Sequence, residues 1–487
     1  MHAREADGDE VFVDELEADR APIRDHCGVA GLAAQGLSSA PPLYAMLRAL
    51  QHRGQESAGI TVIRKGGAAT HKAMGLVENV FPREILNEPD SGVGIGHVRY
   101  STTGGSFLEN AQPVVVSSSA GDVAIAHNGD IVNSGQLREE LKAKGWSFLT
   151  TNDTEVAVRL LANELAHTEN RVKAIRNVVR RLTGSFSLVI LVGGALFAVR
   201  DPLGIKPLCV GKLAGGAGHV VASESTALNA IGADLVRDVE PGEILEIAPE
   251  KIVPHPLGHR DEAAHCMFEY VYFARADSVI DQRPVYDVRH RIGHALATEA
   301  PADADIVVPV PDSGRTHALG YAAKSGLPFV EGLMKNRYVH RTFIMPDQKD
   351  RDQSVRMKLN PVRSQIQGKR VVLLDDSIVR GTTMRRIVAM LRDAGAREVH
   401  VRIGSPPIIA PCYLGIDMNT RQQLVAAEHP IAEIQKLIGA DSLAYLSLDG
   451  LVKAIDLPRR DLCMGCLTGA YPVEIPGEQH RRQQRLF

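Results

Sequence analysis

The pattern of hydrophobic and polar residues changes near residue 258. Between Cys27 and about residue 257, short apolar runs of strand length alternate with Gly-rich turns, and stretches at 41–52, 134–144 and 154–166 have helical spacing. Beyond residue 258, long helical patterns alternate with continuously apolar runs such as DIVVPVP and RVVLLDDS, which is typical of a parallel sheet with helices on both faces. The pattern predicts a strand-rich domain at 27–257, an α/β domain at 258–450 and a C-terminal segment at 451–487.

Residues 1–26 precede the first strand-like run and have a different character. They are acidic, contain few apolar anchors and lack the continuous apolar stretch of a signal peptide, so we expect a leader or propeptide outside the fold. No run of 18 apolar residues occurs anywhere, so we expect no membrane span and a cytoplasmic protein. A formal net charge of -3 gives no reason to expect a nucleic-acid partner.

The most specific local motif is VVLLDDSIVRGTT at 371–383. An apolar strand ends in two acidic residues and turns through hydroxyl-bearing residues into a helix. Main-chain N–H groups and hydroxyls at a helix N-terminus favour a phosphate, while neighbouring carboxylates suit a ribose diol and Mg²⁺. The sequence therefore predicts a sugar-phosphate site formed by Asp375, Asp376, Ser377, Gly381, Thr382 and Thr383.

This segment resembles the loop that binds phosphoribosyl pyrophosphate (PRPP) in type I phosphoribosyltransferases. The resemblance implies one Mg²⁺ per subunit on Asp375 and Asp376, and Ser313, in VPVPDSGRT, matches a further metal-ligand position. The basic segment 335–360 has little periodicity and is expected to close over the pyrophosphate leaving group. Its candidate pyrophosphate-binding residues are Lys335, Arg356 and Lys358.

The first domain carries a series of motifs at expected strand ends or turns: CGVAGL at 27–32, QHRGQESAG at 51–59, GHVRYSTTG at 96–104, HNGDI at 127–131 and NDTE at 152–155. Together with the PRPP loop, they resemble the glutamine PRPP amidotransferases, and the resemblance covers nearly all of residues 27–470. It implies an α+β N-terminal-nucleophile (αββα) glutaminase domain followed by an α/β type I phosphoribosyltransferase domain. The implied reaction makes 5-phosphoribosylamine, glutamate and pyrophosphate from glutamine and PRPP, in the first step of de novo purine synthesis.

Cys27 is the candidate nucleophile, because amide hydrolysis near neutral pH is well served by a thiolate. No His, Asp or Lys of this half stands out as its partner. An α-amino group has a suitable pKa of about 7.7–8.0, and it exists beside this thiol only if residues 1–26 are removed. The leader is thus explained if Cys27 becomes the first residue of the mature chain.

The resemblance assigns the other residues of the glutamine site. Asn128 and the Gly129 N–H would form the oxyanion hole, Arg99 would hold the glutamine α-carboxylate, and Asp153 would hold its α-ammonium. We interpret His97 and His127 as core histidines whose ring nitrogens are satisfied by hydrogen bonds.

The remaining cysteines include a CMGC motif, which supplies two ligands at metal-binding spacing. Cysteine ligation alone leaves zinc and an iron–sulfur cluster open, whereas the resemblance implies a structural [4Fe-4S] cluster. Its ligands would be Cys266, Cys412, Cys463 and Cys466. Cys209 lies in a strand-like run and is interpreted as a packed thiol.

The resemblance also implies a homotetramer, feedback inhibition by purine nucleotides, and a shielded ammonia path with Tyr272 and Arg275 in its wall. Other glutamine amidotransferases, such as a sugar-phosphate aminating or asparagine-forming enzyme, share the first domain. The PRPP loop argues against both, because neither reaction uses PRPP. A PRPP-sensing regulator would be expected to carry a nucleic-acid-binding element, and no helix-turn-helix or basic face is evident.

Overall fold

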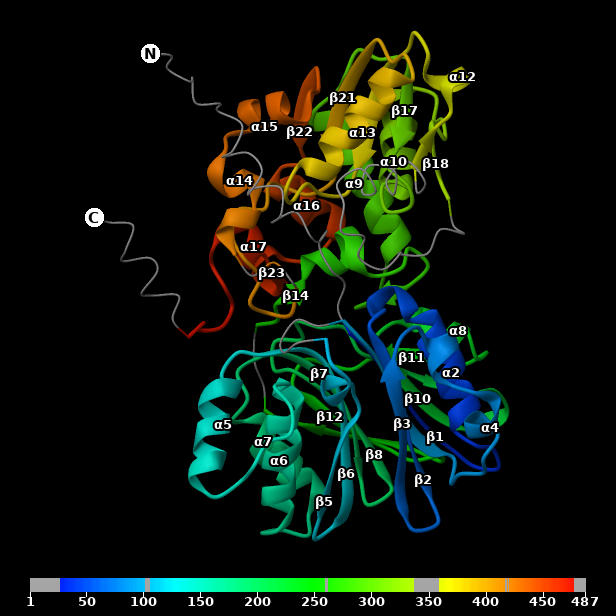
Figure 1. Cartoon of the computed structure of the whole chain (residues 1–487), viewed down its shortest axis with the longest axis vertical. Coiled ribbons are helices and arrows are strands. Elements are labelled where there is room, and N and C mark those ends of the chain that lie inside the picture. The colour runs from blue at the N-terminus through cyan, green and yellow to red at the C-terminus, as the bar shows by residue number, and fades with distance from the viewer. Residues whose placement is uncertain are drawn as a thin grey trace, which may run out of the picture.

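The computed structural model of the chain describes residues 27–100, 106–258, 262–336, 359–416, 418 and 420–476. It has two lobes, with the first domain in the blue-to-green part of the chain and the second in the green-to-red part (Figure 1). The predicted leader, residues 1–26, lies outside the described residues.

Two antiparallel sheets stack face to face in the first domain. In the described part of the chain, one sheet has the order β11 (Asp234–Asp238), β9 (Cys209–Lys212), β10 (Gly218–Ala222), β1 (Gly28–Ala34), β4 (Val93–Arg99), β2 (Ser57–Arg64), β3 (Gly67–Met74). The other has the order β13 (Ile252–Pro256), β12 (Glu243–Ile247), β8 (Ala195–Arg200), β7 (Gly184–Val192), β6 (Gly121–Ile131), β5 (Val114–Ser118). Their inner faces bury a shared apolar layer that includes Val29, Ile95, Ala124 and Val189.

Helices cover the outer faces of both sheets. The sheet that contains β1 is covered by α2 (Ala40–Ala49), α3 (Val77–Val80), α4 (Arg83–Leu86) and α8 (Ser225–Asn229). The sheet that contains β6 is covered by α5 (Ser134–Ala143), α6 (Asp153–Leu165) and α7 (Arg171–Val179). The result is the αββα sandwich that the resemblance implied, and the three predicted helices are confirmed as α2, α5 and α6. The hairpin β2–β3 and helix α7 were not predicted.

The second domain is built on a parallel sheet in the order β17 (Ile306–Pro309), β20 (Arg370–Asp375), β21 (Glu398–Ile403), β22 (Ser442–Tyr445). Side chains of β17 and β20 alternate between two cores, because successive residues of a strand face opposite sides. One core contains α9 (Val285–Glu299), α10 (Arg315–Ser325) and α16 (Leu448–Ile455). The other contains α13 (Thr382–Asp393) and α15 (Ile431–Ile438). The expected doubly covered parallel sheet is confirmed.

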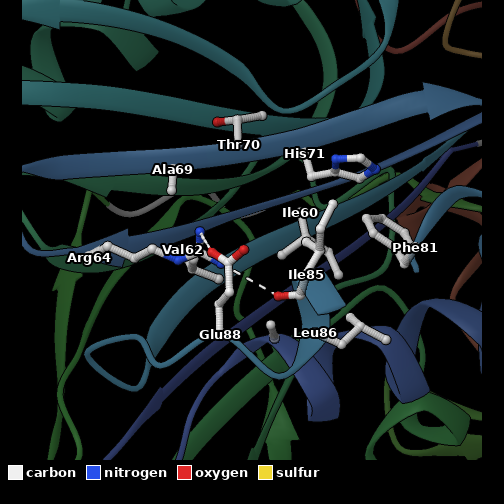
Figure 2. A pocket seen from close by; sticks show the side chains of 11 residues that line it. Ile60, Val62, Arg64, Ala69, Thr70, His71, Phe81, Ile85, Leu86 and Glu88 are labelled. Carbon is white, nitrogen blue, oxygen red and sulfur yellow. Dashed lines mark hydrogen bonds and ion pairs between the residues drawn. The ribbon is translucent and has the colours of Figure 1, made fainter. Parts of the chain in front are cut away.

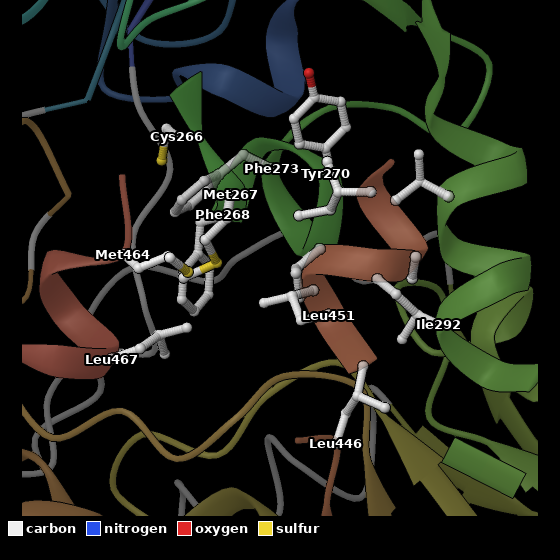
Figure 3. Packing of buried hydrophobic residues seen from close by; sticks show 14 of the residues in the cluster. Cys266, Met267, Phe268, Tyr270, Phe273, Ile292, Leu446, Leu451, Met464 and Leu467 are labelled. Atoms are coloured by element: carbon white, nitrogen blue, oxygen red, sulfur yellow. The ribbon is translucent and has the colours of Figure 1, made fainter. Parts of the chain in front are cut away.

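Short elements complete the second domain. Three two-stranded ladders pair β14 (His265–Cys266) with β23 (Leu462–Cys463), β15 (Val279–Ile280) with β16 (Arg283–Pro284), and β18 (Leu333–Lys335) with β19 (Leu359–Pro361). The short helices described in this domain are η4, a π-helical turn at Glu269–Phe273, α12 (Arg363–Ile366), η5 (Arg421–Gln423), α14 (Val425–Glu428), η6 (Arg459–Asp461) and α17 (Gly465–Thr468). The predicted boundary after residue 450 falls inside α16, whose apolar face packs into the same core as α17 (Figure 3).

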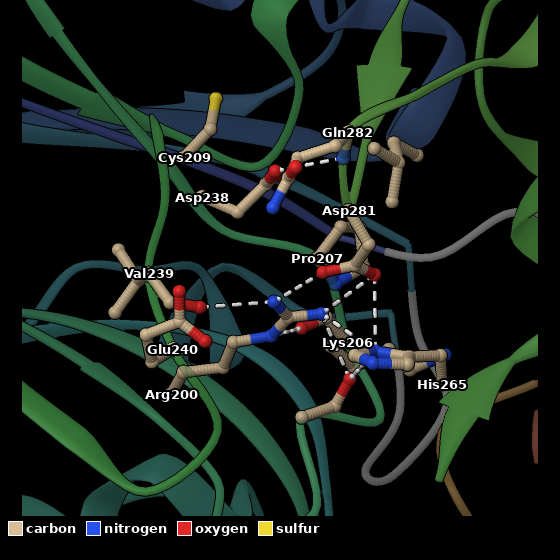
Figure 4. A network of polar contacts seen from close by, with 12 residues as sticks. Arg200, Lys206, Pro207, Cys209, Asp238, Val239, Glu240, His265, Asp281 and Gln282 are labelled. Atoms are coloured by element: carbon tan, nitrogen blue, oxygen red, sulfur yellow. Dashed lines mark hydrogen bonds and ion pairs between the residues drawn. The ribbon is translucent and has the colours of Figure 1, made fainter. Parts of the chain in front are cut away.

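A buried polar network joins the two domains at the end of β8. The Arg200 guanidinium donates to Asp281 Oδ1 at 2.7 Å and to the main-chain oxygens of Gly204 and Lys206 at 2.9 and 2.8 Å (Figure 4). The His265 Nδ1 atom lies 3.0 Å from Asp281 Oδ2. A buried charge is tolerated only with such partners, so Arg200 fixes the loop after β8 against the start of the second domain.

Candidate functional site

Cys27 lies immediately before β1 and is 7% exposed. Its Sγ atom donates to the main-chain oxygen of Tyr100 at 3.4 Å, next to the end of β4. Burial raises the pKa of the Cys27 thiol to about 11, although the nearby positive charge of Arg99 opposes this shift. At neutral pH the thiol is therefore protonated, and attack on an amide requires a base that removes this proton.

The Asn128 side chain, on strand β6 of the facing sheet, is fully buried. Among the described residues, neither its Oδ1 nor its Nδ2 atom has a hydrogen-bond partner. Gly129 has φ +147, and a Cβ atom there would lie 2.0 Å from the main-chain oxygen of Ser185. The backbone at Gly129 therefore requires glycine. The side-chain amide of Asn128 is a buried polar group whose missing partner would be a ligand.

Arg99 and Asp153 are both buried, and the charges of both act on the Cys27 thiol. The two predicted glutamine-binding residues therefore lie near the predicted nucleophile. The NH1 atom of the Arg99 guanidinium lies 3.7 Å from Glu56 Oε2. The Asp153 carboxylate, in the first turn of α6, accepts from the Ile131 N–H at 3.0 Å.

The two predicted core histidines are buried, but their environments differ. Burial lowers the pKa of His97 to about 3, and its Nε2 atom lies 3.0 Å from the main-chain oxygen of His127, which ties β4 to β6. His97 is thus a buried core histidine as predicted, but among the described residues its Nδ1 atom has no hydrogen-bond partner, so the expectation of a fully satisfied side chain is wrong. His127 Nδ1 lies 3.4 Å from Asp153 Oδ1. Burial disfavours the His127 cation, yet the facing Asp153 charge raises its pKa overall, so His127 is an ion-pair partner in the site.

The predicted sugar-phosphate motif borders a cavity of about 320 Å³ at the carboxyl end of β20. Burial and the adjacent Asp376 charge raise the pKa of Asp375 well above its ordinary value. The Ser377 hydroxyl donates to Asp376 Oδ2 at 2.7 Å. Six predicted PRPP-binding residues and Ser313 line this cavity together: Ser313, Asp375, Asp376, Ser377, Gly381, Thr382 and Thr383.

The crowded carboxylates fit the predicted cation, because a positive charge beside them would offset the burial and the Asp376 charge that raise the pKa of Asp375. Tyr272 of η4, which was predicted for the wall of the ammonia path, also lines this cavity. Arg275 is exposed and pairs with Asp277 at 2.8 Å, outside the cavity lining. Lys335 is exposed as well, and its Nζ atom lies 3.1 Å from Asp312 Oδ2, one residue before Ser313. The predicted residues Arg356 and Lys358 lie outside the described residues.

The four cysteines predicted as cluster ligands gather in one region of the second domain. Cys266 of β14 pairs in register with Cys463 of β23, and the Cys466 main-chain oxygen accepts the N–H groups of Ile409 and Ala410, close to Cys412. Burial raises the pKa of the Cys466 thiol, and the other three sulfurs raise it further. Within the described ranges, no three His, Cys, Asp or Glu side chains are spaced to hold a single metal ion. Cys209 lies apart in β9, where it is buried and donates to the Ala222 main-chain oxygen, so the packed-thiol interpretation is confirmed.

The segment after Cys412 packs against the strand that carries Asn128. The Ser185 hydroxyl donates to the Leu414 main-chain oxygen at 2.9 Å and accepts from the Asp130 N–H at 3.2 Å. A Cβ atom on Gly415 would lie 3.1 Å from the main-chain carbon of Gly129. The cysteine-bearing segment of the second domain therefore supports the predicted oxyanion strand of the first, a contact that could not be predicted from the sequence.

A buried arginine that was not singled out from the sequence lies beside the nucleophile. Arg53, at the end of the short 3-10 turn Gln51–Arg53, donates from Nε to the Cys27 main-chain oxygen at 3.2 Å. Its other nitrogens contact Glu224 and Glu269. The sequence does show that Arg53 lies within the motif QHRGQESAG and that Glu269 lies within HCMFEYVYFARADS. Nothing in the two motifs indicated that these residues pair.

A second, smaller cavity of about 160 Å³ lies between strands β2 and β3 and helix α4 (Figure 2). Its lining is largely apolar, and Arg64 pairs with Glu88 at its edge. It contains none of the residues predicted for catalysis or binding.

The helices in the described part of the chain are all too short or too polar to cross a membrane.

Comparison with known proteins gives matches to both domains. Residues 97–230 match the glutamine amidotransferase domain family, and residues 284–403 match the phosphoribosyl transferase domain family. An amidophosphoribosyltransferase of Methanocaldococcus jannaschii is 52% identical over 469 residues, which cover 93% of this chain and 99% of the relative. One from Synechococcus elongatus is 46% identical over 462 residues, 94% of each chain. The solved glutamine PRPP amidotransferase from B. subtilis, complexed with ADP and GMP, has a TM-score of 0.87 at 43% identity and covers 93% of this chain and 98% of that one.

Proposed function

This chain belongs to the amidophosphoribosyltransferases, and we propose the residues through which it carries out their reaction, the first step of purine biosynthesis. Glutamine is hydrolysed in the first domain, and the released ammonia displaces pyrophosphate from PRPP in the second. The observation that carries the assignment of the glutamine site is the buried, unpaired amide of Asn128 on the strand beside the Cys27 sheet.

Cys27 Sγ is the nucleophile and its own α-amino group is the base, once residues 1–26 have been removed. Support comes from the raised pKa of the thiol, about 11, which leaves almost no thiolate at neutral pH without a base. The proton passes from Sγ to the amine as Sγ attacks the side-chain carbonyl carbon of glutamine. The same proton then goes to the departing ammonia, and water cleaves the thioester to give glutamate.

The Asn128 Nδ2 and the Gly129 N–H stabilise the oxyanion that forms in both steps. A donor that has no partner before the substrate arrives needs no reorganisation when charge develops on the carbonyl oxygen. Arg99 binds the α-carboxylate of glutamine and Asp153 its α-ammonium group. Because His127 already faces Asp153, the imidazole holds this carboxylate in its ionised form.

PRPP binds in the 320 Å³ cavity, with its 5-phosphate on the N-terminal turn of α13 and its ribose hydroxyls toward Asp375 and Asp376. Mg²⁺ held by these carboxylates and Ser313 would neutralise charge on the pyrophosphate leaving group. Tyr272 in the cavity wall shields ammonia from water as it arrives at C1 of the ribose. Purine nucleotides are proposed as inhibitors, since the B. subtilis relative was solved with ADP and GMP.

The four gathered cysteines are proposed to hold a structural [4Fe-4S] cluster, which would supply stability and no redox step. The four thiols converge on one region, where Cys266, Cys412 and Cys466 are buried and Cys463 is half-buried. Cysteine ligation alone suits zinc as well, and the proposal of a cluster follows from the match of these four cysteines to the cluster ligands of the resembled family.

The experiment that tests the nucleophile compares glutamine-dependent with ammonia-dependent formation of phosphoribosylamine. In Cys27→Ala we expect the glutamine-dependent rate to vanish while the ammonia-dependent rate persists. Cys209→Ala is the matched control, because it removes another buried thiol of the same sheet and should retain both rates. Retention of glutamine-dependent activity in Cys27→Ala would contradict the assignment.

A further inference from the structure

Arg53 is a fully buried cation at the boundary between the two domains, with every nitrogen of its guanidinium in use. Its Nε donates to the Cys27 main-chain oxygen at 3.2 Å. Its NH1 group donates to Glu224 at 2.5 Å and to Glu269 at 3.0 Å, and its NH2 group donates to Glu269 at 2.7 Å. All three ionised side chains are at most 2% exposed. Buried ion pairs of this kind have little freedom to change partners.

Cys27 has a particular need for such a contact. Strand pairing begins one residue later, with Gly28 opposite Val98. In the mature chain proposed above, no peptide precedes Cys27, and the first residue of a chain frays unless it is tied down. Both chemically active groups, the thiol and the amine, belong to this one residue. The hydrogen bond from Arg53 Nε to its main-chain oxygen therefore fixes the orientation of the nucleophile and the base together.

The second carboxylate that holds Arg53 comes from the other domain. Glu269 begins the π-helical turn η4, which also carries the cavity residue Tyr272. Both ends of this turn are held by Arg289, whose guanidinium donates to the Tyr270 oxygen at 2.8 Å and to the Ala274 oxygen at 2.6 Å. The Arg53 contact on the nucleophile is thus braced by a rigid, buried turn that lines the phosphoribosyl cavity.

We propose that Arg53 is a positioning residue for glutamine hydrolysis, which holds the Cys27 main chain at its attack position and is itself held there by Glu269 of the second domain. The inference rests on Cys27 being the nucleophile. It predicts that a charge change at Glu269, outside the glutamine amidotransferase domain, alters the glutamine reaction. A lysine cannot replace Arg53, because an ammonium is a point charge and lacks the planar fork that reaches two carboxylates and a carbonyl at once.

The test measures kcat and KM for glutamine in Arg53→Lys, Glu269→Gln and the double variant, with the ammonia-dependent rate of each as reference. Arg53→Lys should lower the glutamine-dependent kcat about 10²-fold, the typical effect of a displacement of about 1 Å at a reacting group. Glu269→Gln should lower it about 10-fold, as expected for the loss of a charged hydrogen-bond partner. KM for glutamine and the ammonia-dependent rate should stay within about twofold, since neither residue contacts the proposed glutamine ligands.

Asp281→Asn is the matched control, because it breaks another buried ion pair across the same boundary, that with Arg200, without touching Cys27. It should leave the ratio of the glutamine to the ammonia rate unchanged. The double variant should be no slower than Arg53→Lys, because both changes interrupt one chain of contacts. The proposal is overturned if glutamine and ammonia rates fall together, if KM alone rises, or if Glu269→Gln behaves like Asp281→Asn. Cys27→Ala in the same assay tests the nucleophile separately. If Cys27→Ala stays active with glutamine, Cys27 is not the nucleophile; if it is inactive, a failed prediction above concerns Arg53 alone.

Discussion

Replacement of Asn128 by alanine should separate catalysis from stability. The side chain is fully buried, and within the described residues both of its polar atoms lack partners. An unpaired buried amide costs about 1–3 kcal/mol of folding free energy. Its removal relieves that cost but leaves a small void, at about 1 kcal/mol for each methyl-sized space. The two effects largely cancel, so the free energy of unfolding should change by no more than about 1 kcal/mol.

The effect on catalysis should be large by comparison. Loss of one oxyanion donor typically lowers kcat by about 10²–10³, or roughly 3–4 kcal/mol in the transition state. We therefore expect Asn128→Ala to lose glutamine-dependent synthesis by this factor and to keep the ammonia-dependent rate and the urea midpoint.

Asn110→Ala is the matched control for stability. Asn110 is a buried asparagine whose Oδ1 accepts from the Thr151 N–H at 3.1 Å. Its replacement should lower the urea midpoint, by about 1–3 kcal/mol of unfolding free energy, because it leaves that N–H without its acceptor. An equal loss of stability in Asn128→Ala, or an unchanged glutamine rate, would refute the oxyanion role.

Three further predictions concern the domain boundary, acid and metal. Gly415→Ala introduces a Cβ at φ +93, only 3.1 Å from the Gly129 main-chain carbon. The glutamine-dependent kcat should therefore fall while the ammonia-dependent rate is kept. A glutamine-dependent kcat equal to that of the unaltered protein would contradict the importance of this contact. Burial would raise the pKa values of Glu224 and Asp281, but neighbouring cations hold both well below their usual range. Their stabilisation is thus present above the unfolded values of about 4 and is lost as pH falls through these values toward the lower folded ones, so the urea midpoint should drop from about pH 5 down to pH 3, and less steeply in Asp281→Asn. Cys466→Ser should abolish bound iron and sulfide and lower the melting temperature, whereas stoichiometric zinc in the unaltered protein would contradict the cluster.

Local chemistry could be predicted from the sequence because each part of it is contained in a short segment. The PRPP loop is contiguous, so its strand, turn and helix N-terminus were evident from Asp375 to Thr383, and the structure gathers these residues around one cavity. The half-exposed strand β3 and its hairpin were missed, because this edge strand, GAATHKAM, is rich in Ala and has no alternation of apolar and polar residues. The ion pair of His127 with Asp153 was missed for another reason. It joins side chains 26 residues apart, whose proximity depends on where α6 packs against β6.

The contacts between domains were the least predictable, and they bear most directly on how the two reactions are joined. Leu414 and Gly415 look unremarkable in the sequence, yet they place the segment after Cys412 on the Ser185 hydroxyl and the Gly129 backbone. Arg53 reaches from Cys27 to Glu269 in the same way. Each contact runs from the proposed glutamine site to the second domain, one through the oxyanion strand and one through the nucleophile. Because both are buried and made partly by main-chain atoms, the second domain cannot shift against the first without moving a group that acts on glutamine. The separate glutaminase fold is therefore expected to lack a correctly placed nucleophile, even if its two sheets form on their own.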